Sequence, residues 1–359
     1  MKRTLIALGV AAAVVAPVAN AAPKVYGKIN VSVENSDRSF SGAGASTVPG
    51  AATADRKETR VSSNASRIGI KGEDELTKEL SAVYQIEWGV NTDEATNAAD
   101  FTPRNRFLGL KHADYGTVKI GQFDSYFKAA EGKVDQFNDL FGDFDKTAGG
   151  QDRLRSVVGY ESPKIAGLQF NILTQGQDST NGTAKKNGIS SSVVFDDKET
   201  GIYAALAYNK SVLGASLIGS AAGSFANAGS REQDALRAVV GLNLGDLSLG
   251  ALYQQSEASV TPAAKADDKE SAYLVSAAYK IDDVVLKAQY AVGERKDDLA
   301  AGAAGVNKRT STSIGADYNL TSKTSVQSFF TQVKEEGQVV AGTYEGKDNV
   351  IGLGLSHSF

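Results

Sequence analysis

Residues that could carry out acid–base or nucleophilic chemistry are scarce in this sequence. It contains two histidines, His112 and His357, and no cysteine. Histidine-assisted hydrolysis needs an imidazole beside a nucleophile, and zinc sites draw on histidine and cysteine. His112 instead precedes a turn-like ADYG stretch, and His357 falls on the apolar side of an alternating segment. We therefore predict a protein that is not an enzyme and needs no cofactor or metal.

The chemistry that remains is that of charge. Acidic residues gather between positions 124 and 152: Asp124, Glu131, Asp135, Asp139, Asp143, Asp145 and Asp152. A calcium loop would show the D-x-D-x-D-G…E pattern, which this segment lacks, so a specific cation site is disfavoured. The net charge of the whole chain is only −4, which argues against a general nucleic-acid binder.

The elements that must position these charges are strands. Apolar and polar residues alternate with a period of two in sixteen segments, and no amphipathic helix interrupts them. The predicted strands are 25–34, 60–72, 79–90, 104–112, 116–124, 153–161, 166–175, 188–196, 201–211, 234–244, 246–257, 270–280, 284–295, 309–319, 324–335 and 348–359. Their connections alternate between short turns and long polar loops, of which 125–152 is the third and longest. This alternation is typical of an outer-membrane barrel.

Strand lengths and aromatic residues agree with a membrane barrel. A strand of about 10 residues rises about 33 Å, and a tilt of about 45° projects this onto the ~25 Å apolar band of such barrels. Tyrosines lie near strand ends on the apolar side, where interfacial girdles occur: Tyr160, Tyr208, Tyr253, Tyr279, Tyr290 and Tyr318. We predict an all-β, sixteen-stranded antiparallel transmembrane barrel.

The N-terminal 21 residues are interpreted as a secretory signal peptide. Lys2 and Arg3 precede an apolar stretch over 4–16, and Ala19-Asn20-Ala21 forms an A-x-A cleavage site. The apolar run is short of the ~20 residues of a spanning helix. Cleavage after Ala21 would leave a single barrel domain over 22–359.

Five stretches in order resemble a known family. They are VYGKINVSVE, SRIGIKGEDEL, RNRFLGLKHADYGTVKIGQFDS, RLRSVVGYESPKIAGLQF and the terminal GLGLSHSF. Together they resemble the general diffusion porins of Gram-negative bacteria, nearest to the neisserial and β-proteobacterial branch. The resemblance implies a homotrimer in the outer membrane, passage of ions and small hydrophilic solutes, and a third long loop that folds inward to narrow the pore.

The resemblance also implies site residues. Acidic residues on the inserted loop should face a basic ladder on the wall, and the matching bases all have lumen-facing parity in the predicted strands: Lys28, Arg67, Arg104, Arg106, Arg153 and Arg155. Arginine facing lipid at the midplane costs about 2–4 kcal/mol, which favours the inward placement. Arg104 and Arg106 compete for one family position, as do Arg153 and Arg155. On the loop, Asp135 and Asp139 match the family's acidic pair, and Asp143 follows.

The inserted loop needs anchors, and the chain needs a closing strand. Phe137, Leu140, Phe141 and Phe144 would be exposed if 125–152 were an ordinary surface loop, so we expect them to pack on the wall. A closed barrel leaves no free edge, so the last strand must pair with the first. Phe359 would then face lipid, where the resemblance implies that the barrel assembly machinery reads it.

Two other functions stay open. A substrate-specific channel for sugars would use a spiral of aromatic residues along the lumen, whereas Tyr26, Tyr203 and Phe329 are scattered. A surface adhesin or receptor scaffold would act through the long loops, which are polar and of ordinary length. A lipase or protease in the outer membrane is disfavoured by the placement of His112 and His357.

Overall fold

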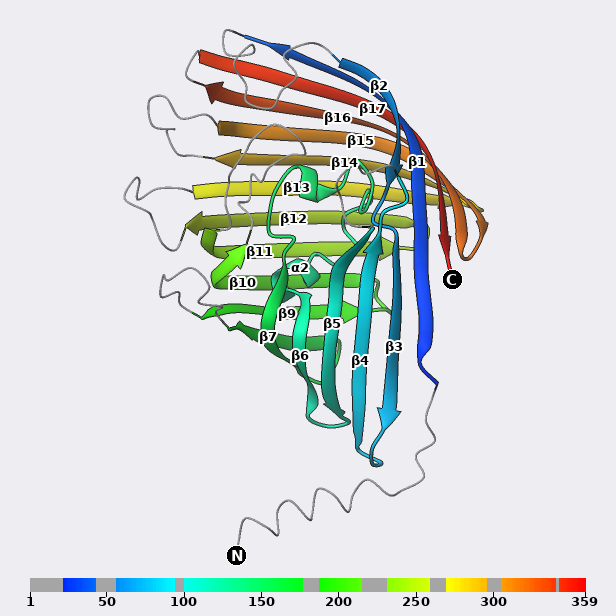
Figure 1. The fold of residues 1–359 in the computed structure, drawn as a ribbon, viewed down its shortest axis with the longest axis vertical. Coiled ribbons are helices and arrows are strands. Elements are labelled where there is room, and N and C mark those ends of the chain that lie inside the picture. Colours follow the sequence, from blue (N-terminus) through cyan, green and yellow to red (C-terminus); the bar gives the residue numbers. More distant parts are fainter. Residues whose placement is uncertain are drawn as a thin grey trace, which may run out of the picture.

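The computed structural model describes residues 22–42, 56–93, 100–176, 187–214, 231–258, 269–295, 305–339 and 342–359. Their strands form one antiparallel sheet that closes on itself (Figure 1). The first nine strands are β1 (Lys24–Ser41), β2 (Arg56–Ser63), β3 (Arg67–Glu75), β4 (Leu80–Val90), β5 (Phe101–His112), β6 (Gly116–Asp124), β7 (Arg153–Glu161), β8 (Leu168–Gln175) and β9 (Gly188–Asp197). The others are β10 (Ile202–Gly214), β11 (Arg231–Leu244), β12 (Leu247–Ala258), β13 (Lys269–Ile281), β14 (Val284–Arg295), β15 (Gly305–Thr321), β16 (Thr324–Val339) and β17 (Gly342–Ser358).

The barrel has sixteen positions in its wall although the described residues form 17 strands. β2 and β3 share one position, because both pair with β1 on the side opposite β17. The sequence predicted one strand over 60–72, and the break at residues 64–66 is a difference from that prediction. Ala65 adopts a φ of +51° there, while the Ser66 hydroxyl accepts from the Asn30 amide at 2.9 Å and donates to the Asn30 carbonyl at 3.1 Å.

Pairing of β1 with β17 closes the sheet. Fourteen residue pairs run from Lys28↔Ser358 to Ser41↔Glu345. Beyond them, Gly27 and Phe359 exchange two backbone hydrogen bonds of 3.1 Å each. The ring of Phe359 lies over Gly27, where an added Cβ would sit 2.2 Å from the ring. The predicted closure of the last strand on the first is therefore confirmed.

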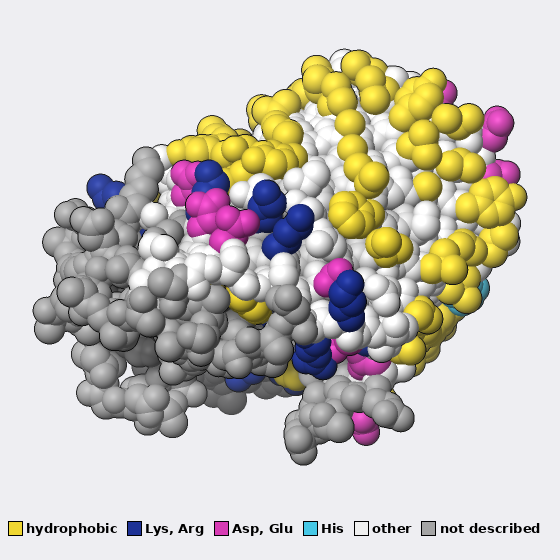
Figure 2. Space-filling view, turned by 90° about the horizontal axis from the view of Figure 1, so that it is seen from above, with side chains coloured by type: hydrophobic (Ala, Val, Ile, Leu, Met, Phe, Trp, Pro, Cys, Tyr) yellow, Lys and Arg dark blue, Asp and Glu magenta, His cyan; other side chains and the backbone are white. Residues whose placement is uncertain are grey.

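The two faces of each strand follow the predicted alternation. On β1, Val25 and Val33 are more than half exposed, whereas Asn30 and Glu34 are at most 1% exposed. Exposed hydrophobic side chains continue over the outer surface, as Figure 2 shows for the part of that surface that the undescribed residues do not cover. A polar interior and an apolar exterior are the arrangement that a membrane-spanning barrel requires.

Of the six tyrosines predicted to lie on the apolar face, five are exposed: Tyr208, Tyr253, Tyr279, Tyr290 and Tyr318. Tyr160 is half-buried and donates its hydroxyl to the Tyr115 carbonyl at 2.8 Å. No helix among the described residues is long and apolar enough to cross a membrane. The predicted signal peptide, residues 1–21, lies outside the described residues.

Candidate functional site

The segment 125–152, between β6 and β7, lies inside the barrel (Figure 1). It contains one helical turn, α2 (Tyr126–Ala129), and one 3₁₀ turn, η3 (Phe144–Lys146). Phe127, Phe137 and Phe144 are completely buried. Phe127 and Phe144 belong to a cluster with the inner wall from β10 to β14, and Phe137 packs with residues of β16 and β17. The expectation that aromatic residues anchor this loop to the wall is met.

Polar side chains of the wall hold the loop's backbone as well. Each of the following donors bonds a carbonyl of the loop at 2.9–3.1 Å: Tyr203 to Ala130, Arg237 to Phe127, Gln254 to Gly149, Gln289 to Gly142 and Arg309 to Lys146. Since a buried carbonyl without a partner is costly, these donors make the inserted position a satisfied one. The sequence analysis did not identify these loop contacts, because Arg237 and Arg309 stand among other charged and polar residues of β11 and β15.

The loop's tip meets two of the predicted wall bases. The Oδ2 atom of Asp139 lies 3.2 Å from Lys28 Nζ on β1 and 3.2 Å from Arg67 Nη1 on β3. Asp139 has a φ of +70°. All three side chains are partly exposed to the lumen, between 14% and 25%. The tip therefore touches the wall through charges that water can still reach.

Two further predicted bases, Arg104 and Arg153, line the same lumen cavity. Arg104 Nε lies 2.6 Å from a carboxylate oxygen of Glu87 on β4. Arg153 donates to Asn105 at 2.8 Å and lies 3.0 Å from Asp124. These bases are thus paired with acids of the wall rather than with the loop. The cavity measures about 810 Å³ and carries equal numbers of basic and acidic side chains among its described lining residues.

Arg106 and Arg155 do not share this lumen, which corrects the prediction that they belong to the ladder. A bulge shifts the register of β5 between its partners Ile86 and Trp88, so Arg106 pairs with the outward-facing Ile86. In β7 a second bulge, at Ser156 with a φ of +55°, shifts the register so that Arg155 also faces outward. Both arginines are exposed. An extra residue reverses the faces of the strand beyond it, which decides the choice between each adjacent pair.

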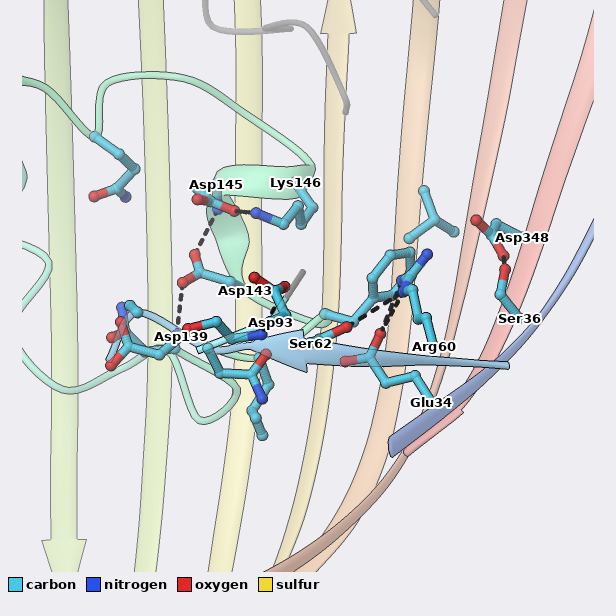
Figure 3. A pocket seen from close by; sticks show the side chains of 18 of the residues that line it. Glu34, Ser36, Arg60, Ser62, Asp93, Asp139, Asp143, Asp145, Lys146 and Asp348 are labelled. Carbon is cyan, nitrogen blue, oxygen red and sulfur yellow. Dashed lines mark hydrogen bonds and ion pairs between the residues drawn. The ribbon is translucent and has the colours of Figure 1, made fainter. Parts of the chain in front are cut away.

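Asp135 and Asp143 also differ from the expected arrangement, because both bind the loop's own backbone. Asp135 accepts from the amides of Phe137 at 2.9 Å and Phe144 at 2.7 Å. Asp143 accepts from the amides of Asp139 at 2.7 Å and Asp145 at 2.8 Å (Figure 3). Each is 8% exposed. Asp139 is therefore the member of the predicted acidic set that reaches the wall bases.

Burial raises the pKa of two acids on the inserted loop itself. It raises the pKa of Asp135 to about 7, and the nearby charge of Glu131 adds to the effect. Burial likewise raises the pKa of Glu131 to about 7 against the opposing pull of Arg237. A carboxyl whose pKa is raised in the inserted loop binds its proton more tightly there than in a released loop.

We expect the inserted loop to be held more tightly at low pH. The extra stability of the inserted position is fully present below the ordinary carboxyl pKa of about 4. It is lost as the pH rises through about 7. Open-channel current noise should therefore increase between pH 5 and pH 8. Asp135→Asn, which cannot ionise, should weaken this pH dependence while Glu131 still contributes, and an unchanged profile would contradict the role of Asp135.

The histidines lie away from these contacts. His112 stacks on Tyr115 at the β5–β6 turn, with ring centroids 4.4 Å apart. His357 bonds Thr324 at 2.9 Å near the end of β17. Within the described ranges, no group of three or more His, Asp or Glu side chains is arranged to hold a metal ion.

Comparison with known proteins decides the family. The family model for Gram-negative porins matches residues 7–338. The chain belongs to the Gram-negative porin family. This porin is 27% identical to the major outer membrane protein P.IB of Neisseria meningitidis serogroup B over the full length of both chains. It is therefore an outer-membrane channel for passive diffusion of ions and small hydrophilic solutes.

Solved structures show the same fold. The porin matches an anion-selective porin from Comamonas acidovorans with a TM-score of 0.67 at 17% identity, covering 94% of this chain and 99% of the other. It matches Salmonella typhi OmpF, solved with daunomycin, with a TM-score of 0.65 at 17% identity, covering 94% and 97%. The resemblance seen in the sequence is confirmed, and porins are channels rather than enzymes.

Proposed function

We propose that the narrowest part of the channel lies between the inserted loop and the wall that carries Lys28, Arg67, Arg104 and Arg153. The observation that carries this proposal is the contact of Asp139 with Lys28 and Arg67 at 3.2 Å each. Opposed charges across a water-filled passage orient water and favour polar solutes over apolar ones. Passage is passive and needs no cofactor.

A modest preference of the channel for anions follows from the burial of two of the loop's acids. Asp135 and Asp143 are buried and bonded to backbone amides, so they contribute little negative charge to the lumen. The side chains of Arg67 and Arg104 remain 25% and 21% exposed there. The similarity of fold to an anion-selective porin is in line with this preference.

General diffusion is favoured over a sugar-specific channel because the lumen-facing aromatic residues are occupied. Tyr203 bonds the loop at Ala130, Tyr26 bonds Glu87 at 2.8 Å, and Phe329 is buried against Phe137 and Leu140. Rings engaged in this way do not form a continuous track for a solute.

We expect Arg67→Gln and Arg104→Gln to make the channel more permeable to cations. In a salt gradient, the reversal potential should move toward the value of a cation-selective channel. A unit charge about 7 Å from an ion contributes about 0.6 kcal/mol in water before screening, so each substitution should change the permeability ratio by up to several-fold. Arg106→Gln and Arg155→Gln are matched controls on the outer face and should leave the ratio unchanged. Controls that shift it as strongly as Arg67→Gln would refute the proposed constriction.

We also propose that the porin is a homotrimer whose subunits meet along β1–β6. Exposed tyrosines of the described strands are confined to β10–β15, whereas the outer face of β1–β6 is mainly aliphatic. The same face carries the exposed Arg106, whose Nη2 donates to Gln122 at 2.6 Å. Arginine facing lipid costs about 2–4 kcal/mol near the midplane, so a neighbouring subunit is the better environment. Conductance steps in the experiment above should then occur in multiples of three.

The assembly pathway is a further part of the proposal. Phe359 follows the outward-facing Ile351, Leu353 and Leu355 on β17, and is itself 45% exposed. We propose that the barrel assembly machinery recognises this ending before β17 pairs with β1.

A further inference from the structure

The backbone of the loop's tip has an unusual conformation at Asp139. Its φ of +70° lies in the left-handed region, which residues with a Cβ adopt infrequently and which aspartate tolerates better than most. From this backbone the side chain extends so that one oxygen, Oδ2, contacts both Lys28 and Arg67. The contact with the wall therefore depends on how residue 139 is held.

The Asp143 carboxylate holds that residue. Its Oδ2 accepts from the Asp139 amide at 2.7 Å, and its Oδ1 accepts from the Asp145 amide at 2.8 Å. The Asp143 amide in turn donates to the Leu140 carbonyl at 3.0 Å. In Figure 3 the carboxylate of Asp143 lies between residues 139 and 145, with a dashed line to each. One side chain thus fixes both ends of the turn that forms the tip.

We propose that Asp143 is a positioning residue of the pore: it holds the backbone of residue 139 so that the Asp139 carboxylate stays against Lys28 and Arg67. This inference rests on the constriction proposed above. In that role Asp143 sets the width of the passage through the loop's shape, and the charge it presents to the lumen is secondary.

The surroundings of Asp143 support this assignment over a role as a lumen charge. Both of its oxygens are engaged by amides, and the residue is 8% exposed. Burial raises the pKa of Asp143 well above its ordinary value, with further contributions from the charges of Asp145 and Asp135. By contrast, Asp145 is 43% exposed in the same cavity and pairs with Lys146 at 2.7 Å, so it provides a matched control.

The test compares Asp143→Asn, Asp143→Ala, Asp145→Asn and Asp139→Asn in the full-length porin reconstituted in planar bilayers. Asparagine keeps the shape and one acceptor oxygen, whereas alanine removes both acceptors. We expect Asp143→Ala to reproduce the conductance and current noise of Asp139→Asn, with Asp143→Asn between Asp143→Ala and wild type. The double variant Asp139→Asn/Asp143→Ala should match Asp139→Asn alone, because each single substitution already removes the same contact, that of Asp139 with Lys28 and Arg67. Asp145→Asn should shift the reversal potential without added noise.

Several results would overturn the inference. If Asp143 acted through charge, Asp143→Asn and Asp143→Ala would shift the reversal potential equally, add to Asp139→Asn and resemble Asp145→Asn. If Asp143→Ala does not assemble, noise in Asp143→Asn at the level of Asp145→Asn is the refuting result. If Asp139→Asn itself conducts like wild type, the proposed constriction fails together with this inference, whereas failure of the Asp143 variants alone leaves the constriction standing.

Discussion

Replacing Arg237 with alanine is expected to loosen the inserted loop while leaving the barrel closed. Arg237 is completely buried and donates to the Phe127 carbonyl at 3.0 Å. Its guanidinium lies 4.3 Å from the Phe127 ring and 3.6 Å from a carboxylate oxygen of Glu131. It also bonds Gln254. One side chain thus links β11 and β12 to the start of the loop.

The size of the effect follows from what the substitution leaves behind. Removing one partner of a buried ion pair costs about 3–5 kcal/mol because the remaining charge is uncompensated. Here the remaining group is Glu131, whose pKa is already raised to about 7 and which can take up a proton, so the cost lies below that range and adds to that of the unsatisfied Phe127 carbonyl. The backbone pairing of β11 with β12 does not depend on the Arg237 side chain, although Gln254 loses its donor, so most of the cost falls on the loop. We expect larger and noisier single-channel currents from Arg237→Ala, with normal heat-modifiable barrel in detergent.

A second variant separates charge from packing. Arg237→Met with Glu131→Gln removes both charges and keeps most of the volume, and neutral replacement of a buried pair is often tolerated. It should restore quieter currents than Arg237→Ala. Arg155→Ala removes an arginine from the outer face and serves as a control for the substitution itself. Wild-type currents from Arg237→Ala would show that the aromatic anchors suffice to hold the loop.

The strands were predictable from the sequence because each has one face in lipid. Alternation survives wherever outward residues are aliphatic and inward ones polar, and the predicted ranges 116–124, 153–161 and 284–295 coincide with β6, β7 and β14. The split between β2 and β3 was not predictable in this way. No glycine or proline marks the break at Ala65 in the sequence. The conformation of Ala65 accompanies the contact of Ser66 with Asn30, which lies 36 residues away.

The placement of the bases was predictable up to the first bulge. Strand parity puts Lys28 and Arg67 on the inner face, where the structure has them. It fails for Arg106 and Arg155, because a single extra residue in β5 and in β7 reverses the face. Pro103 and Gly121 flank the two register shifts, but neither residue indicates in the sequence which of the two adjacent arginines faces the lumen.

The loop's acids posed a different problem. Their number and spacing were readable, but the groups that their carboxylates bind were not. Asp135 and Asp143 bind backbone amides of a turn whose shape is set by wall contacts such as Gln289 with Gly142, 147 residues apart. Such contacts are consequences of the whole fold and leave no local pattern.

The C-terminal residue gives the second large effect, and it should fall on assembly. Deleting Phe359 removes the two backbone hydrogen bonds with Gly27 and the ring that covers it. Phe359→Ala removes the ring alone. Since the side chain is 45% exposed, its packing contributes only about 1 kcal/mol, roughly half the value for full burial. We nevertheless expect both variants to reduce assembled barrel in the outer membrane strongly, because we propose that the ending is recognised before folding.

Two measurements distinguish recognition from packing. The amount of heat-modifiable barrel in cells reports assembly, and the thermal stability of barrel refolded from denatured chain into detergent reports packing. Gly27→Val is the comparison variant on β1: its added atoms would collide with the Phe359 ring and with the Arg67 carbonyl oxygen of β3, while the terminal sequence stays intact. If the ending is a recognised signal, Phe359→Ala should lose cellular assembly but refold to near wild-type stability, and Gly27→Val should lose stability but keep more of its assembly. If both variants lose cellular assembly in proportion to their loss of stability, Phe359 acts by packing on Gly27 and the recognition proposal is wrong.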